Sequence, residues 1–249
     1  MLNSSLIAKI GGKILENPED LDFTISQFKL LLKKKIIQQI IIIPGGGKFS
    51  NFIREIDDKL DIGDDLAHWM AIYAINQSGK MLNKEYPNIE ITDNFKELQK
   101  FKNPLSIFLP FNYLYQTDEL PHSWDVTSDS ISLYLAHKLE LNECYLIKDV
   151  DGIINDKNQV IKELSIMEYK NLKKLDMLAN IRTNHEDLKR SKPTDQYSLT
   201  LIDKYKITCI ILNGTNKKSR ILSYFERSKN SDNIYTRINF ENKKKRLKF

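Results

Sequence analysis

Residues 39–47 read QIIIIPGGG, a run of isoleucines that ends in three consecutive glycines. A short β-branched run is typical of a buried strand, and the glycines mark the turn that follows it. Residues 6–12, LIAKIGG, have the same form. Because glycine has no Cβ, backbone N–H groups in such turns can approach phosphate oxygens closely. The sequence therefore predicts two buried strands, each followed by a turn that suits an anion.

Strand-like runs and helical periodicity alternate outward from these two turns. Further strands are expected at residues 106–110, 143–148 and 207–212, with 234–240 as a late edge strand. Helices are expected at residues 20–35, 49–60, 64–82, 129–139, 166–175 and 194–205. This alternation predicts an α/β fold with a mainly parallel sheet, in which ligands gather at the carboxyl ends of the strands.

The length of 249 residues suits one large domain. We expect that domain at residues 1–240, with one lobe at about 1–140, a second at about 141–240, and a basic tail at 241–249. The tail holds part of the net charge of +5. Such a tail can bind nucleic acid or anionic lipid but is more commonly a solvated end, so we expect no nucleic-acid partner and no membrane.

The composition is that of a globular protein, with 41% hydrophobic and 29% charged residues. The first residues lack the apolar core of a signal peptide, and no apolar run is long enough to span a bilayer. Cys144 and Cys209 each lie in an apolar run and form neither a disulfide framework nor a zinc pattern. The prediction is a cytoplasmic protein with two buried thiols.

Lys9 lies just before the first glycine turn, where its charge would stabilise a phosphoryl group in transfer. The turn is not a P-loop, which needs GxxxxGK followed by Ser or Thr. One glycine turn of this kind can be purely structural. Two such turns, each after an isoleucine-rich strand, favour an anion-binding site, and the second can act at the N-terminus of the next helix.

Residues 121–129, PHSWDVTSD, form a polar cluster at the start of a predicted helix. Thr127 or Ser128 can serve as the N-cap, and Asp129 suits the helix dipole. The functional alternative is that Asp129 holds two lysines in place. His122, beside the acids, is a better candidate for substrate contact than His68, which can be a packing residue.

Residues 148–153, KDVDGI, follow a predicted buried strand. A structural turn explains the segment, because Asp and Gly are natural turn formers. The functional alternative is that its polar groups frame a nucleotide base. The segment lacks the register and the distal Glu of a calcium loop. No spacing resembles a zinc site and no nucleophile motif appears, so we expect no metal bound by the protein's own residues.

In their order along the chain, five segments resemble the amino acid kinase superfamily, which includes acetylglutamate, aspartate, uridylate and isopentenyl phosphate kinases. The segments are KIGG, IIIPGGG, TSDSISLYLAHKL, YLIKDVDGI and IILNG, and the resemblance covers roughly residues 6–240. Two further segments, DDLAHWMAIYAINQ and LPHSWDVTSDSI, are most similar to archaeal kinases of aminomethylfuran-methanol phosphate. The resemblance implies a three-layer α/β/α sandwich, ATP with Mg²⁺, a small-molecule phosphoryl acceptor and a homo-oligomer.

The resemblance also implies a role for each matching residue. Lys9 would neutralise the transferring phosphoryl group, and Asp129 would orient the catalytic lysines. The implied nucleotide-binding residues are Gly11, Gly12, Lys148, Asp149, Gly152 and Asn213. The implied acceptor-binding residues are Gly45, Gly46, Gly47, His68, His122, Asp125 and Thr127.

Three positions depart from the family pattern. Lys13 stands where a small hydroxyl residue usually follows the glycine pair. The segment that carries a second catalytic lysine in several relatives is absent, which leaves Lys192 and Lys217 as candidates. A late glycine is missing before Thr236. These departures leave open a catalytically weak, nucleotide-binding regulatory protein on the same fold.

The resulting functional prediction is an ATP-dependent kinase that transfers the γ-phosphoryl group to a small acceptor. Our first choice of acceptor is a phosphate monoester, which would become a diphosphate. That acceptor is already an anion, so no general base is required. The alternative within the same chemistry is transfer to a carboxylate, which gives an acyl phosphate.

Overall fold

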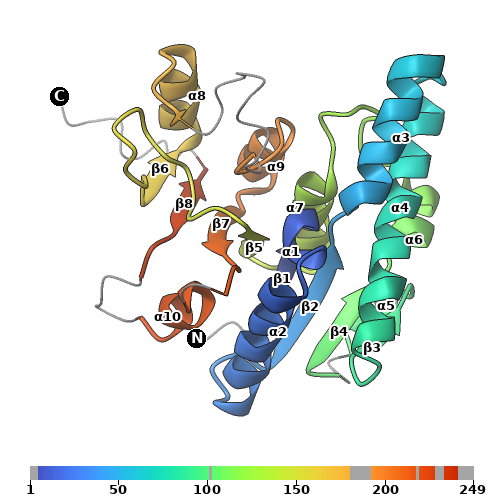
Figure 1. The fold of residues 1–249 in the computed structure, drawn as a ribbon, viewed down its shortest axis with the longest axis horizontal. Helices are drawn as coiled ribbons and strands as arrows, with labels where there is room; N and C mark the ends of the chain where they lie inside the picture. The colour runs from blue at the N-terminus through green and yellow to red at the C-terminus, as the bar shows by residue number, and fades with distance from the viewer. Residues whose placement is uncertain (1–4, 101–102, 180–191, 217–218, 228–232, 241–249) are drawn as a thin grey trace.

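Eight strands form one sheet at the centre of the protein, in the order β3-β4-β2-β1-β5-β7-β8-β6 (Figure 1). The computed structural model describes residues 5–100, 103–179, 192–216, 219–227 and 233–240. The strands are β1 (Ser5–Ile10), β2 (Gln39–Pro44), β3 (Glu90–Thr92), β4 (Leu105–Phe108), β5 (Glu143–Lys148), β6 (Glu163–Ser165), β7 (Thr208–Asn213) and β8 (Thr236–Asn239). Pairing is parallel from β3 to β7, and β8 pairs antiparallel with β7.

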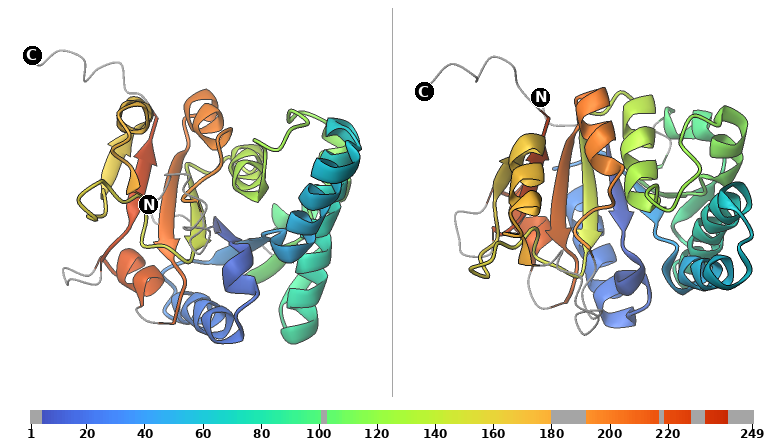
Figure 2. Two further views of the ribbon diagram at one scale, coloured as in Figure 1. Left: turned by 45° about the horizontal axis from the view of Figure 1, so that its top comes forward. Right: turned by 90° about the horizontal axis from the view of Figure 1, so that it is seen from above.

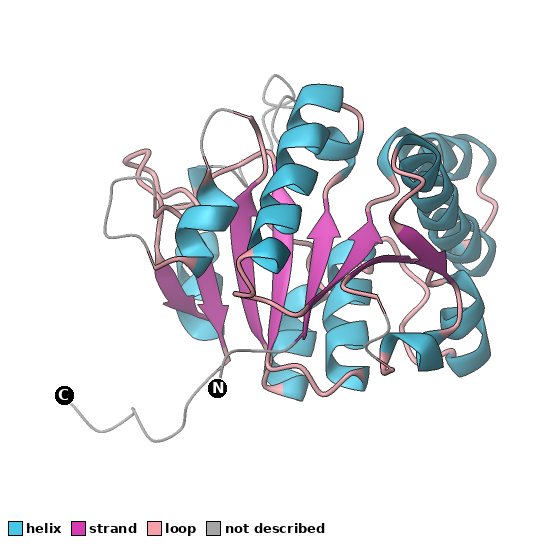
Figure 3. Cartoon of the chain, turned by 90° about the horizontal axis from the view of Figure 1, so that it is seen from below, coloured by secondary structure: helices cyan, strands magenta, loops and turns pink. Residues whose placement is uncertain are grey.

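Helices cover both faces of this sheet (Figures 2 and 3). They are α1 (Gly12–Leu15), α2 (Pro18–Lys33), α3 (Gly47–Leu60), α4 (Asp64–Glu85), α5 (Phe95–Leu98), α6 (Phe111–Thr117), α7 (Ser128–Lys138), α8 (Ile166–Lys174), α9 (Ser198–Tyr205) and α10 (Arg220–Phe225). Buried side chains of α1, α2 and α10 pack on one face, and those of α7 and α9 pack on the other. The predicted three-layer α/β/α sandwich with a mainly parallel sheet is confirmed.

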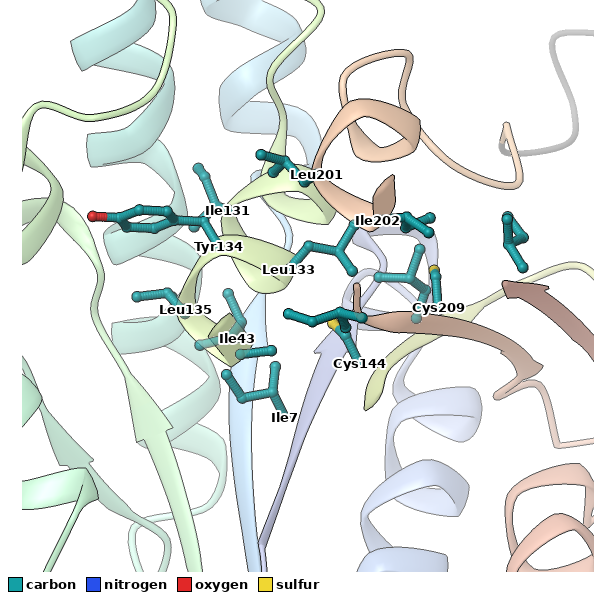
Figure 4. Close-up of a cluster of buried hydrophobic side chains, with 14 of the residues drawn as sticks. Ile7, Ile43, Ile131, Leu133, Tyr134, Leu135, Cys144, Leu201, Ile202 and Cys209 are labelled. Carbon is teal, nitrogen blue, oxygen red and sulfur yellow. The ribbon is translucent and has the colours of Figure 1, made fainter. Parts of the chain in front are cut away.

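The alternation of side chains along the central strands determines where the polar residues point. On β1, Ala8 and Ile10 pack with α2, whereas Ile7 packs with α7. On β5, Cys144 and Leu146 pack on the α7 side (Figure 4). Lys9 is two residues after Ile7 and Lys148 is two residues after Leu146, so the same alternation directs both lysines toward α7.

The predicted strands and helices agree with the structure apart from their ends and one position in the sheet. Residues 234–240 were expected to form an edge strand, but β6 pairs with β8 and takes the edge. Helix α9 begins at Ser198 rather than at residue 194, because Asp195 accepts a hydrogen bond from the Ser198 N–H and so precedes the first turn. The helices and strands that were not predicted are only three to seven residues long, and segments of that length show little periodicity.

Cys144 and Cys209 lie opposite each other on β5 and β7, and both thiols are buried and free. Burial raises the pKa of both thiols, as expected for inert packing residues. Within the described ranges, no helix combines the length and apolar character needed to cross a bilayer. The basic tail and Lys217 lie outside the described residues.

Candidate active site

Asp129 holds two buried lysines at the carboxyl ends of the central strands. Its Oδ1 lies 2.8 Å from the Nζ of Lys9, and its Oδ2 lies 2.6 Å from the Nζ of Lys148. The three residues are only 5%, 2% and 6% exposed for Lys9, Asp129 and Lys148. Lys9 lies on β1, Asp129 lies in the first turn of α7, and Lys148 lies at the end of β5. The side-chain alternation of the two strands and the position of the helix start bring the three residues together.

The charges of this trio do not cancel, because two ammonium groups share one carboxylate. Burial lowers the pKa of Lys9 to about 8, and the charge of Lys148 also lowers it. Burial opposes ionisation of Asp129, but Lys148 and Lys9 hold the pKa of its carboxyl below the ordinary value. Burial likewise opposes the charge of Lys148, but Asp129 raises the pKa of that lysine. A buried positive charge therefore remains, and an anion would neutralise it.

Asp195 fixes the start of α7, which carries Asp129. Its Oδ2 accepts hydrogen bonds from the Thr127 N–H at 3.0 Å and the Ser130 N–H at 3.0 Å. Its Oδ1 accepts from the Ser130 hydroxyl at 2.6 Å and from the Ser198 N–H at 2.8 Å. One carboxylate thus ties the starts of α7 and α9 together. The sequence analysis missed Asp195 because it placed that residue inside the helix predicted at residues 194–205.

The two glycine turns lie directly against each other. A Cβ on Gly12 would lie 2.6 Å from the Cα of Gly47, and one on Gly45 would lie 2.9 Å from the backbone nitrogen of Gly12. Gly47 also has a φ of 54°, in the left-handed region that favours glycine. No side chain fits between the turns, so their backbone forms the wall of the site.

A cavity of about 320 Å³ lies between the glycine turns, α3, α4 and the start of α7. Predicted site residues in its lining are Lys9, Gly12, Gly45, Gly46, Gly47, His68 and Thr127. The lining includes the basic side chains of Lys9, Lys13 and Arg54 and one acidic side chain, that of Glu16, and its apolar part includes Ile72, Ile75, Val126 and Ile131. A lining of this composition suits a ligand that has both an anionic group and an organic part.

Two predicted acceptor-binding residues lie outside this lining. His122 has both ring nitrogens engaged, at 2.6 Å from Asp65 Oδ1 and 2.8 Å from Asp118 Oδ1. Asp125 is exposed, and its carbonyl oxygen accepts a hydrogen bond from the Tyr197 N–H at 3.2 Å. This geometry does not support contact between either residue and a ligand in the cavity, because both residues face other partners.

The remaining predicted nucleotide-binding residues lie at the ends of β5 and β7, which place Lys148 and Asn213 side by side. Asn213 Nδ2 donates a hydrogen bond to Asp151 at 3.1 Å, which ties the KDVDG turn to β7. Lys13, the unusual residue after the glycine pair, lies with its Nζ 3.6 Å from Asp149 Oδ2. The first glycine turn and the KDVDG turn are therefore in contact through an ion pair.

Lys148 occupies the second oxygen of Asp129. Of the two candidates for a second catalytic lysine, Lys192 is exposed and its carbonyl oxygen lies 3.4 Å from Lys148 Nζ, whereas Lys217 lies outside the described residues. Another lining residue that the sequence analysis missed is Arg54, whose guanidinium lies 4.6 Å from the centre of the Trp124 ring. Arg54 could have been identified from the sequence because it lies two helical turns after Gly47. In the part of the chain that is described, no three His, Cys, Asp or Glu side chains are grouped to hold a metal.

The fold and this site define a phosphotransferase of the amino acid kinase type. The sequence profile of the amino acid kinase family matches residues 5–213, and the chain belongs to that family. It is 32% identical over 234 residues to [5-(aminomethyl)furan-3-yl]methyl phosphate kinase from Methanocaldococcus jannaschii, an alignment that covers 93% of this chain and 96% of that protein. The prediction of a kinase, and of a resemblance to this group of kinases, is confirmed.

Solved structures of other kinases share the fold. UMP kinase from Ureaplasma parvum superposes with a TM-score of 0.65 at 19% identity, covering 96% of this chain and 100% of that one. Uridylate kinase from Archaeoglobus fulgidus gives a TM-score of 0.61 at 14% identity, covering 94% and 99%.

Replacing Asp129 tests the energetics of the trio. We expect Asp129→Asn to lower the free energy of unfolding by about 3–5 kcal/mol, because it leaves two buried ammonium groups without a counter-ion. Asp129→Asn combined with Lys148→Met should recover part of that loss. Urea unfolding at pH 7 measures both effects. Asp149→Asn, which removes a longer and partly exposed ion pair, serves as the control and should cost at most about 1 kcal/mol.

Proposed function

We propose that this chain transfers the γ-phosphoryl group of ATP to a small phosphate monoester and so produces a diphosphate and ADP. The observation that carries the proposal is the buried, positively charged trio of Lys9, Asp129 and Lys148, which meets a cavity walled by glycine backbone. The relative from M. jannaschii is named as the kinase of a methyl phosphate compound, which supports an acceptor of this class.

In this reaction, an oxygen of the acceptor phosphate forms the new bond to the γ-phosphorus, and the bond from that phosphorus to ADP breaks. No base is needed, because the attacking oxygen is already ionised. The chain contributes position and charge: Lys9 and Lys148 neutralise the phosphoryl oxygens, and glycine-turn N–H groups donate to them. The N–H groups of Gly11 and Gly45 are not among these donors, because they donate to the carbonyl oxygens of Ile147 and Ile10. Electrostatic stabilisation of this kind is the main source of catalysis in phosphoryl transfer.

The nucleotide and the acceptor are assigned to different sides of Lys9. We assign the ATP side to Gly11, Gly12, Lys148, Asp149, Gly152 and Asn213. We assign the acceptor side to Gly45, Gly46, Gly47, His68 and Thr127, with Arg54 added as a further basic group for the acceptor phosphate. Mg²⁺ neutralises charge on the ATP phosphates when it is bound, and these phosphates would supply most of its ligands.

We rank the regulatory alternative below the kinase, because a second lysine, Lys148, contacts Asp129. The late glycine before Thr236 is still missing, so the ADP-release assay has to decide this point too. An acyl-phosphate-forming kinase would use the same trio. The acceptor is therefore the point that an assay has to decide.

Release of ADP with a panel of acceptors tests the reaction and the role of Lys9. We expect turnover with [5-(aminomethyl)furan-3-yl]methyl phosphate or another small phosphate monoester, and none with amino acids or other carboxylates. Lys9→Ala should lower kcat by about 10³-fold or more, because it removes a charge that acts on the transferring group. Lys29→Ala, on the exposed side of α2, is the matched control. Turnover only with carboxylates, or full activity in Lys9→Ala, would contradict the proposal.

The low pKa of Lys9 predicts the alkaline side of the pH profile. Because burial lowers that pKa to about 8, the ammonium that attracts phosphate is lost as the pH rises through about 8, and kcat/KM for ATP should fall there. Lys9→Arg keeps its charge over this range, so whatever activity that variant retains should stay level between pH 7 and 10. A wild-type profile that is level to pH 10 rules out this role of Lys9.

We also infer that the chain forms a homo-oligomer through the outer surface of α3 and α4. Phe52 and Tyr73 are 62% and 49% exposed there and line an apolar groove of about 490 Å³. Helix α4 carries Asp64 at its start and Lys84 in its last turn. A second copy related by a twofold axis perpendicular to α4 would place its own α4 antiparallel to the first and bring these opposite charges together.

Charge introduced into this groove tests the oligomer. Phe52→Glu with Tyr73→Glu should yield a monomer, because burying two carboxylates in an apolar contact is unfavourable. Light scattering after gel filtration measures the mass. Leu175→Glu, at an exposed position after α8, is the control and should keep the mass of the wild type. A wild-type monomer, or an unchanged mass in the double variant, excludes this interface.

A further inference from the structure

His68 and His122 form a stacked pair beside the acceptor cavity. Their ring centroids are 4.5 Å apart and their planes differ by 20°. His68 lies on α4, is 6% exposed and lines the cavity, whereas His122 lies between α6 and α7, outside the lining. Trp69 contacts both rings by its edge or face, at 5.0 and 5.1 Å between centroids. The pair is therefore fixed on more than one side.

Two carboxylates hold His122 from opposite sides of its ring. Nδ1 lies 2.6 Å from Asp65 at the start of α4, and Nε2 lies 2.8 Å from Asp118 at the end of α6. A ring that donates from both nitrogens is an imidazolium. The bond to Asp65, together with the bond to Asp118, raises the pKa of His122 above its ordinary value. The two carboxylates therefore favour the positively charged form of His122 and clamp its ring between two elements.

His68 has the opposite charge state. Burial and the neighbouring charge of His122 lower the pKa of His68 to about 4, so its ring is neutral at physiological pH. Among the described residues, none forms a hydrogen bond with that ring, and the groups that face it from the packed elements are His122, Asp65 and Asp118. A neutral imidazole offers one N–H donor and one acceptor nitrogen, and both remain available beside the cavity.

We propose that Asp65, His122 and Asp118 are positioning residues that hold a neutral His68 against the organic part of the acceptor. The proposal rests on the phosphotransferase function proposed above. A charged His68 would compete with Lys9 for the acceptor phosphate. A neutral His68 leaves that phosphate to the basic lining residues and makes a hydrogen bond to the organic part. The acceptor class is thus a phosphate monoester with a hydroxyl, ring oxygen or amine on its organic part.

The test uses two kinds of measurement on the intact chain. Asp65→Asn with Asp118→Asn removes the clamp at exposed positions, where the side chains are 88% and 58% accessible. Asp64→Asn changes the same helix start and serves as the control. The chain has four histidines, so NMR of ¹³C-labelled histidine rings, assigned with single His→Gln variants, follows each titration. In the double variant, the titration of His122 should move to lower pH, because it loses both carboxylate partners.

Kinetics with [5-(aminomethyl)furan-3-yl]methyl phosphate as the probe separates positioning from a structural role. In the double variant, the KM for this acceptor should rise about tenfold, while the KM for ATP and kcat stay within about twofold. His68→Leu should show the same rise in acceptor KM, and combining it with the double variant should add little, because both changes remove one interaction.

The outcomes are distinguishable. Any of three results would overturn the positioning role. The acceptor KM is unchanged in the double variant, or it rises equally in Asp64→Asn, or the effects of the double variant and His68→Leu on the acceptor KM are independent and additive. A titration of His122 that does not respond to the loss of both aspartates would overturn the clamp itself, and this arm needs no substrate. If the wild type releases no ADP with the probe or any other phosphate monoester, the proposed function fails, and the acceptor part of this inference fails with it.

Discussion

The carboxylate of Asp129 is the constraint on which the rest of the site depends. Two lysines point into the same buried space because the alternation of β1 and β5 leaves them no other direction. Without a shared counter-ion, that arrangement would be strongly unfavourable. The first turn of α7 supplies the counter-ion, and Asp195 holds that turn in place. The fold thus maintains a positive charge where a phosphoryl group would need it.

The three-layer fold could be predicted from the sequence because its main elements are long and strongly patterned. The isoleucine runs of β1 and β2 and the spacing of α4 identify strand and helix directly. The short β6 carries no such pattern, so its place outside β8 was not predictable. Sheet order is a tertiary property, which local periodicity does not encode.

The site was predictable only in part, for a related reason. Sequence order identified Lys9 and Asp129, and it placed Lys148 at the end of a buried strand. That Lys148 reaches Asp129 depends on the pairing of β5 with β1, which no single segment reveals. The sequence favoured His122 over His68 for substrate contact, but His68 is the one that lines the cavity, and the two carboxylate partners of His122 are 57 and 4 residues away in the chain. Contacts of this kind become visible only when the chain is folded.

The direct contact of the two glycine turns has a consequence for how such a protein can diversify. Because the turn after β1 and the turn after β2 touch at backbone distance, a substitution in either one displaces the other. The two turns therefore cannot vary independently of each other. The far wall of the cavity, along α3 and α4, is lined by side chains rather than main chain, so substitutions there leave the turns undisturbed. A duplicated copy of this gene would be expected to acquire a new substrate there first.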